Sequence, residues 1–250
     1  MPTNEITIIR SRDRDPNNVG GDSGTVLIAR DVTTDISGTL GVNIATFENC
    51  RYDYTPKYDV YLYCLSGTLR IGTSAGDVVA NPGDGIWIPK GTPITYKADD
   101  AATLVDAYFP INWKTLAESG ELLSPSGDVC KFAITDRLFD DFLGNGSCLL
   151  GRDVGPDVST TMGTNTAVFE HCSFEWTTRY DEYLYCLDGE LTFETNGGTH
   201  VLNPGDAIWF PEDTWMVIKS DKKSVAVVAV YPVDWRDRTG FDKSEVAVGD

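Results

Sequence analysis

The most constraining feature of this chain of 250 residues is an internal repeat. Residues 27–113 align with residues 149–235 without an insertion or a deletion, and nearly half of the aligned pairs are identical. Unrelated sequences of ordinary composition would match at roughly one position in seventeen. The repeat therefore records a duplicated domain. Its identical residues report the shared fold, and its differing residues indicate which half kept a chemical function.

The repeat predicts two domains, which we place at residues 1–122 and 123–250. Each half is long enough to bury a hydrophobic core of its own. Apolar residues recur with a period of two over most of the repeat, which is typical of strands. Short strands separated by turn signals such as Asp188-Gly189 indicate an all-β sandwich or barrel. Helices are expected only at 113–123 and 134–143.

Composition excludes several classes of partner. The formal net charge is −18, with 38 acidic against 20 basic residues. Nucleic-acid binding draws its affinity from Lys and Arg, so we expect no nucleic-acid partner. No apolar run is long enough to cross a membrane, and the first residues are too polar for a signal peptide. Six cysteines without a CxxC pair indicate free thiols, and we expect a cytoplasmic protein.

Two spacings in the second repeat carry a family resemblance. Six residues separate Glu182 from Gly189 in a strand–turn–strand pattern, and five residues separate Gly205 from Pro211 in a strand that follows a Pro-Gly-Asp turn. These spacings resemble the two sequence motifs of the cupin superfamily, and the resemblance extends to the first repeat. It implies a bicupin, in which two tandem jelly-roll β-barrels are related by internal duplication.

A more specific resemblance is to the EutQ-like cupins of ethanolamine utilisation. Those proteins have a run similar to the one from Phe174 to Gly189, and an aromatic-Pro-x-x-Trp strand end similar to the one from Tyr231 to Trp235. The resemblance is a strong indication of fold. It is a weak indication of function, because one barrel fold supports many chemistries.

The sequence departs from the metal site that the resemblance implies. Cupins that bind a metal use two His and a Glu from the first motif and a His from the second. This chain has two His in total, too few for a three-His site, so we expect no metal and no other cofactor. In the second repeat these positions hold Glu175 and Thr177 (Trp176 and Thr178 if the spacing is one shorter), Glu182 and Met216, and in the first repeat Asp53, Thr55, Val60 and Ile94.

Strand alternation predicts which side chains line the second barrel. If Glu175 points inward, His171 and Thr177 share its face, and Glu182 and Cys186 line the neighbouring strand. Two carboxylates in a low-dielectric barrel cannot both ionise cheaply, so the pKa of one should rise towards neutrality. The predicted catalytic residues are Glu182, Glu175, Tyr180 and His171, and the predicted ligand-binding residues are Trp209, Thr177, Met216 and Cys186.

The sharpest difference between the halves is Glu182, which the first repeat replaces with Val60. A barrel interior accommodates Val readily, whereas a buried Glu costs several kcal/mol unless it is paired. We therefore expect the first barrel to have a degenerate site and the second to carry the active or ligand site. In the first barrel, Arg51 could pair with Asp53 and fill the interior.

These residues favour metal-independent acid–base chemistry on a small carbonyl or hydroxyl metabolite, of the isomerase, epimerase, dehydratase or lyase type. Several alternatives stay open. The protein could be a non-catalytic sensor that holds a small molecule, an EutQ-like ethanolamine-utilisation protein, or a metal protein with His171, Glu175 and Glu182 as ligands. His171 could instead be a structural histidine, and the N-terminal arm could join a neighbouring chain in a homodimer.

Overall fold

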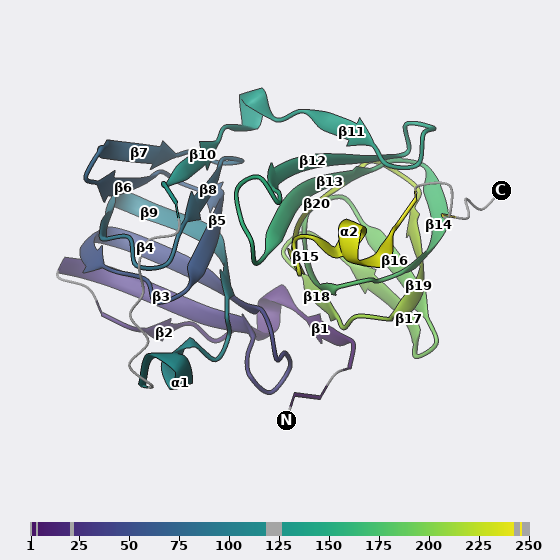
Figure 1. Ribbon diagram of the computed structural model, residues 1–250, viewed down its shortest axis with the longest axis horizontal. Coiled ribbons are helices and arrows are strands. Elements are labelled where there is room, and N and C mark those ends of the chain that lie inside the picture. The colour runs from purple at the N-terminus through teal and green to yellow at the C-terminus, as the bar shows by residue number, and fades with distance from the viewer. Residues whose placement is uncertain (1, 4, 21–22, 119–126, 243–245, 247–250) are drawn as a thin grey trace. The chain divides into compact units, whose positions relative to one another are not determined.

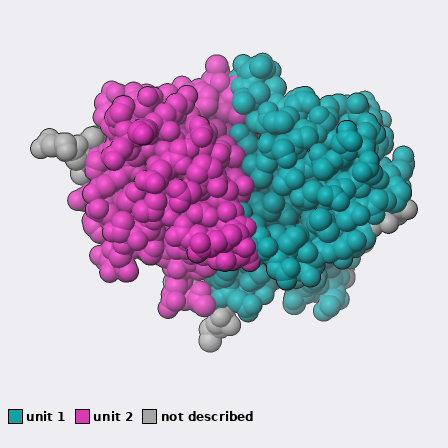
Figure 2. Space-filling model, turned by 180° about the vertical axis from the view of Figure 1, so that it is seen from behind, with its two compact units in different colours: residues 1–2, 14–136 teal, residues 3–13, 137–250 magenta. Residues whose placement is uncertain are grey.

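The computed structural model describes residues 2–3, 5–20, 23–118, 127–242 and 246. They form two compact units, which Figure 2 colours separately. The first unit comprises residues 1–2 and 14–136, and the second comprises 3–13 and 137–250. This division differs from the predicted cut between residues 122 and 123, because the segment ahead of each half belongs to the other unit.

The first unit consists almost wholly of antiparallel strands (Figure 1). Its main sheet has the order β10-β8-β5-β9-β4-β3-β2, and β6 pairs with both β7 and β9. Strand β9 pairs with β6 near its start and with β5 near its end, so it joins two layers of one barrel. The elements are β2 (Asn17–Asn18), β3 (Ser23–Val32), β4 (Gly41–Tyr54), β5 (Asp59–Ser66), β6 (Leu69–Thr73), β7 (Gly76–Ala80), β8 (Gly85–Ile88), β9 (Ile94–Phe109), α1 (Trp113–Glu118), β10 (Cys130–Phe132) and the 3-10 turn Ile134–Asp136.

The second unit repeats this architecture with its two layers as separate sheets. One sheet has the order β1-β18-β15-β20-β13-β12-β11, and the other has the order β14-β19-β16-β17. The predicted all-β duplication is therefore confirmed. The elements are β1 (Thr7–Ile9), the 3-10 turn Ser11–Asp13, β11 (Phe139–Asp141), β12 (Cys148–Val154), β13 (Gly163–Phe169), β14 (Cys172–Thr177), β15 (Asp181–Asp188), β16 (Leu191–Thr195), β17 (Gly198–Leu202), β18 (Ala207–Phe210), β19 (Trp215–Ser220), β20 (Ser224–Tyr231) and α2 (Trp235–Thr239).

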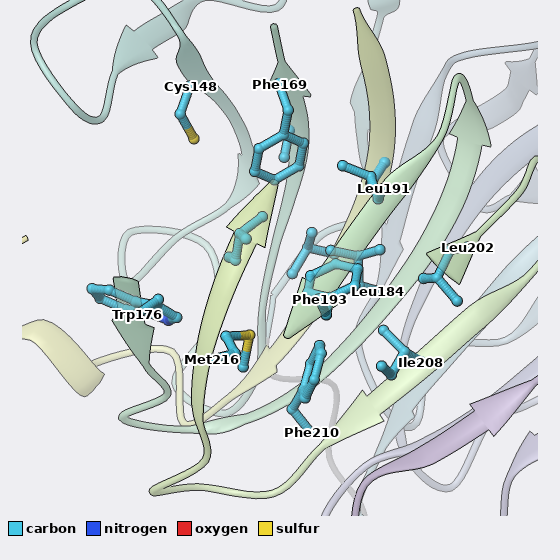
Figure 3. Close-up of a cluster of buried hydrophobic side chains, with 14 of the residues drawn as sticks. Cys148, Phe169, Trp176, Leu184, Leu191, Phe193, Leu202, Ile208, Phe210 and Met216 are labelled. Atoms are coloured by element: carbon cyan, nitrogen blue, oxygen red, sulfur yellow. The ribbon is translucent and has the colours of Figure 1, made fainter. Parts of the chain in front are cut away.

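The core of the second unit lies between these two sheets. Large side chains from both sheets converge there, among them Trp176, Leu184, Phe193 and Phe210 (Figure 3). Each such side chain contributes about 1.5–3 kcal/mol when it is removed from water. The alternation of apolar and polar residues along the strands thus closes each barrel around its own interior, which positions the cavities described below.

The tight turn after β15 depends on a glycine. Gly189 has a φ of 77°, a left-handed conformation that disfavours residues with a side chain. A Cβ atom there would also lie 2.5 Å from the carbonyl oxygen of Lys223. The equivalent Gly67 has a φ of 74°, so both repeats need glycine at this corner.

A short segment precedes each repeat, which we call its arm, and each arm belongs to the unit that the other repeat forms. Strand β1 from the start of the chain pairs with β18 in the second unit, and β10 from the middle of the chain pairs with β8 in the first. The aspartate of each Asn-Pro-Gly-Asp turn holds the arm through its carboxylate. Asp206 accepts the backbone N–H of Ser11 at 2.9 Å, and Asp84 accepts that of Ile134 at 3.0 Å.

One of the two helix predictions is wrong and the other is only partly described. Helix α1 begins at Trp113 and is described to Glu118, so 119–123 lie outside the described residues. The predicted helix at 134–143 is a single 3-10 turn followed by β11. Tertiary contacts override the local sequence preference there, because β11 pairs with β12 and the Arg137 side chain bonds the Asp153 carboxylate.

Candidate functional site

The second barrel contains a cavity of about 230 Å³. Its walls come from β12, β13, β14, β15 and β20 and from the segment around α2. Aromatic and aliphatic side chains form most of this lining, and a few polar groups project into it. The polar and titratable lining residues include Glu182, Tyr180, Asn165, Cys148, Arg152, Asp234, Arg236 and Asp237.

Glu182 is the buried carboxyl of this cavity. It lies on β15 between Val230 of β20 and Phe210 of β18, and 8% of the residue is exposed. Among the described residues it has no hydrogen-bond or salt-bridge partner. Burial raises the pKa of Glu182 to about 7, because the apolar wall disfavours the charged form. A carboxyl with such a pKa can both give and take a proton near neutral pH.

Tyr180 lies next to Glu182, and its ring packs near two indoles that are also close to each other. The ring centroid of Tyr180 is 4.7 Å from that of Trp235 and 6.4 Å from that of Trp176. Burial, and then the charge of Glu182, raise the pKa of Tyr180 well above its ordinary value. The phenol therefore stays protonated and can donate a hydrogen bond to a bound molecule.

Two arginines of this cavity were missed by the sequence analysis. Arg152 and Arg236 both line it, Arg152 with an exposed side chain and Arg236 partly buried. Burial, and then the nearby charge of Arg152, lower the pKa of Arg236. Two adjacent guanidinium groups favour an anionic group such as a carboxylate. Arg152 has an identical repeat partner in Arg30, and this identity was the sequence signal that could have indicated Arg152.

The predicted facing of β14 is wrong. Glu175 and Thr177 are exposed on the outside, whereas Phe174 and Trp176 are buried and line the cavity. The same holds in the first unit, where Arg51 and Asp53 form an exposed ion pair at 3.6 Å and do not fill the barrel. Strand alternation is correct, but the apolar residues of β14 take the inner face, as burial of apolar surface requires.

His171 is also outside the cavity. It is exposed and has a φ of 48°, and its repeat partner Asn49 has a φ of 45°. Both residues thus occupy a tight left-handed corner, which supports the structural interpretation of His171. The other histidine, His200 on β17, has its ring 3.4 Å from the Thr195 hydroxyl and is likewise not a described lining residue.

Three of the predicted ligand-binding residues are buried but do not reach the cavity. Met216 belongs to the hydrophobic core, and Trp209 is 1% exposed on the opposite face of β18 from Phe210. The Cys186 thiol donates to the carbonyl of Asp188 at 3.7 Å. None of the three is among the described residues that line the cavity. Of the eight predicted site residues, only Glu182 and Tyr180 do so.

The donor set does not fit a cupin metal. Next to Glu182, the inward positions on β14 are Phe174 and Trp176, neither of which can ligate a metal. Within the described residues, no group of three or more His, Cys, Asp or Glu is placed to hold an ion. The alternative set of His171, Glu175 and Glu182 is not assembled, because the first two lie on the outside.

Several solved structures share the fold of this protein. The putative glyoxylate-induced protein of Pseudomonas aeruginosa superposes with a TM-score of 0.73 at 16% identity, covering 92% of this chain and 90% of its own. A cupin 2 conserved barrel domain protein from Leptotrichia buccalis gives a TM-score of 0.59 at 14% identity, covering 87% of this chain and 96% of its own. These likenesses show that the molecule has a two-barrel cupin fold.

Sequence comparison narrows the class to a family. Residues 5–115 and 146–237 match the family described as "Ethanolamine utilisation protein EutQ", and the chain belongs to that family. It is 31% identical to the acetate kinase EutQ of Clostridioides difficile (strain 630) over 94 residues, 37% of this chain and 60% of the relative. It is 27% identical to the acetate kinase EutQ of Escherichia coli (strain K12) over 85 residues, 34% of this chain and 36% of the relative. The chain thus spans less than two thirds of either relative.

No helix in the part of the chain that the structure describes is both long and apolar enough to cross a membrane.

Proposed function

We propose that the second barrel catalyses metal-independent acid–base chemistry on a small polar metabolite. The observation that carries this proposal is Glu182, a buried carboxyl on a cavity wall whose pKa of about 7 suits proton transfer near neutral pH. A carboxyl group that exchanges a proton suits isomerisation, epimerisation, dehydration and lyase chemistry. Each moves a proton at a carbon or oxygen next to a carbonyl or hydroxyl group.

The cavity supports a role for each nearby group. The ionised form of Glu182 takes a proton from the substrate, and the protonated form returns one. Tyr180 stays protonated and orients the reacting oxygen by donating a hydrogen bond. Arg152 and Arg236 line the same cavity and suit a substrate with a carboxylate. A volume of about 230 Å³ restricts the substrate to a small metabolite.

Proton exchange in D2O tests this function before the substrate is known. The protein is incubated with a panel of small hydroxy and oxo carboxylates, and the loss of carbon-bound proton signals is followed by NMR. We expect exchange of at least one compound, with a rate that rises with pH through about 7 as Glu182 ionises. Glu182→Gln should lower the rate about 10²- to 10⁴-fold.

Glu175→Gln is the matched control, because Glu175 is exposed on the outer face of the preceding strand β14. Its rate should equal that of the unmodified protein. An unchanged rate in Glu182→Gln removes that residue from the mechanism. A panel compound that binds in the second barrel and is recovered without exchange identifies a binding module instead of an enzyme.

A second candidate is acetate kinase activity, which is favoured by the similarity to the two relatives that carry this name. Against it, the sequence has no Gly-rich phosphate loop of the GxxxxGK[ST] type. Formation of acetyl phosphate from ATP and acetate decides between the candidates. Turnover that persists in Glu182→Gln would support the kinase and contradict the acid–base role of Glu182.

A further inference from the structure

The first barrel, expected to be degenerate, holds a second cavity. Its volume is about 600 Å³, against about 230 Å³ in the second barrel. The walls come from β3, β4, β5 and β9 and from the segment at the start of α1. This barrel is therefore neither filled by an Arg51–Asp53 pair nor closed to a ligand.

Tyrosine rings form a continuous wall of this cavity. Tyr52 stacks on Tyr54 with ring centroids 5.5 Å apart, and Tyr54 lies 6.4 Å from Tyr58. The wall continues to Tyr108, 4.9 Å from Tyr58, and to Tyr96, 6.4 Å from Tyr52. At the equivalent positions the second barrel has Phe174, Trp176, Tyr180, Val230 and Ile218, so it keeps one phenol of five.

Asp106 is the one carboxylate among the described residues that line this cavity. Its Oδ2 accepts a hydrogen bond from the Asn43 amide at 2.9 Å, whereas its Oδ1 is buried without a partner. A buried carboxylate oxygen without a partner costs free energy that a bound donor or cation would recover. The second repeat has Val228 at this position, so the carboxylate is specific to the first barrel.

We propose that the first barrel is a second ligand site, which binds the ammonium group of a small organic cation between the tyrosine rings and Asp106. The faces of aromatic rings attract cations, and aromatic cages are the usual recognition device for alkylammonium groups. The Oδ1 atom of Asp106 supplies the opposite charge inside the barrel. This site is separate from Glu182 and does not depend on the chemistry of the second barrel.

The basic residues of the cavity lie at its rim. Arg30 and Lys114 line the cavity but are exposed to solvent, and the Lys114 ammonium lies 5.5 Å from the ring centroid of Trp113. Water screens these rim charges, whereas the charge of Asp106 acts inside the low-dielectric wall. The interior therefore selects a cation, because an anion would face Asp106 and the electron-rich ring faces.

Calorimetric titration of the full chain tests the site with two probes of one shape. The cationic probe is choline, and the neutral probe is dimethylbutanol, its analogue with carbon in place of nitrogen. We expect choline to bind about tenfold more tightly than the alcohol. Asp106→Asn should weaken choline binding about tenfold and leave binding of the alcohol unchanged. The control Asp53→Asn, a change on the exposed face of β4, should alter neither affinity.

Circular dichroism establishes that each variant is folded. If Asp106→Asn does not fold, Tyr54→Leu decides, since loss of one ring should weaken choline binding and spare the alcohol. The proposal is overturned if choline fails to bind at millimolar concentration, if both probes bind equally, or if neither variant discriminates against choline.

Discussion

The two barrels share a frame but differ in where they place a carboxyl group. Arg30, Asn43, Tyr58 and Trp113 line the first cavity, and their repeat partners line the second at the same positions. The acidic residue differs, because β9 carries Asp106 in the first barrel and β15 carries Glu182 in the second. Each is replaced in the other repeat by a valine, Val228 or Val60.

The two repeats have therefore kept the same strand framework, while the position of the carboxyl group inside the barrel has changed independently of it. Asp106 has a hydrogen-bond partner in Asn43 and faces a wall of phenols. Glu182 has no described partner and faces a smaller cavity. Burial raises the pKa of both carboxyls, to about 6 for Asp106, where the Asn43 hydrogen bond opposes the rise, and to about 7 for Glu182. A hydrogen-bonded carboxylate suits binding, and a lone one suits proton transfer.

The largest expected effect concerns an ion pair that both units contain. Arg137 bonds Asp153 in the second unit with side chains 2% and 1% exposed, and Arg14 bonds Asp31 in the first with 11% and 0% exposed. Arg137→Met should lower the free energy of unfolding by about 3–5 kcal/mol, because it leaves a buried charge unpaired. Arg14→Met should cost less, since water reaches its site more easily. Urea denaturation followed by tryptophan fluorescence measures both changes. Equal losses of unfolding free energy would show that water reaches the two ion pairs equally.

A smaller effect distinguishes the carboxyl of the second barrel through pH. The folded pKa of Glu182 lies above the unfolded value of 4.5, so the folded state binds more protons between about pH 4.5 and 7. Glu182 therefore costs no stability below this window, and it costs increasing stability as pH rises through it. The Glu182→Gln substitution should therefore increase the free energy of unfolding, and this increase should be up to about 3 kcal/mol larger at pH 8 than at pH 4. Thermal unfolding at both pH values checks this, with Glu175→Gln as the variant that should show no such gain.

The smallest expected effect concerns the carboxylates that hold the arms. Partial burial acts to raise the pKa of Asp206, but the Ser11 N–H and the Arg10 guanidinium outweigh it, and the pKa is lowered. The pKa of Asp84 is lowered in the same way, with Lys131 in place of Arg10. Their contribution to stability is present above the unfolded pKa and is lost as pH falls through the folded value.

Asp206→Asn should therefore cost about 1 kcal/mol at pH 7 and speed amide exchange in β1. Asp84→Asn should have the same effect on β10. Hydrogen exchange resolved by segment measures the two arms separately. If Asp206→Asn loosened β10 instead of β1, the assignment of arms to units would be wrong.

The fold could be predicted from the sequence because two signals agreed. The repeat set the number of barrels, and apolar alternation with Asp-Gly and Asn-Pro-Gly-Asp turns set the strands. The arms could not be predicted, because a three-residue strand such as β1 has no periodicity and its partner is about two hundred residues away. Arg14 and Arg137 lie ahead of their repeats at a spacing one residue out of the repeat register, so the alignment did not extend the frame upstream.

The site was predicted only in part. The contrast between the halves singled out Glu182, and the structure places this residue on the cavity wall. The same contrast exists between Asp106 and Val228, and it is the sequence signal for the first cavity. The facing of β14 was inferred from a family motif, although Cys172, Phe174 and Trp176 alternate with Ser173 and Glu175 in the plain pattern of an apolar inner face.

The exchanged arms also determine when the molecule can be completed during synthesis. Thr7 pairs with Trp209, so β1 leaves the ribosome long before its partner strand exists. At 5–20 residues per second this wait is roughly 10–40 seconds. Over that interval the first unit can close around β10, while the opening segment of the chain stays unpaired. Strand β1 is therefore translated before the whole first barrel but can pair only after most of the second barrel exists.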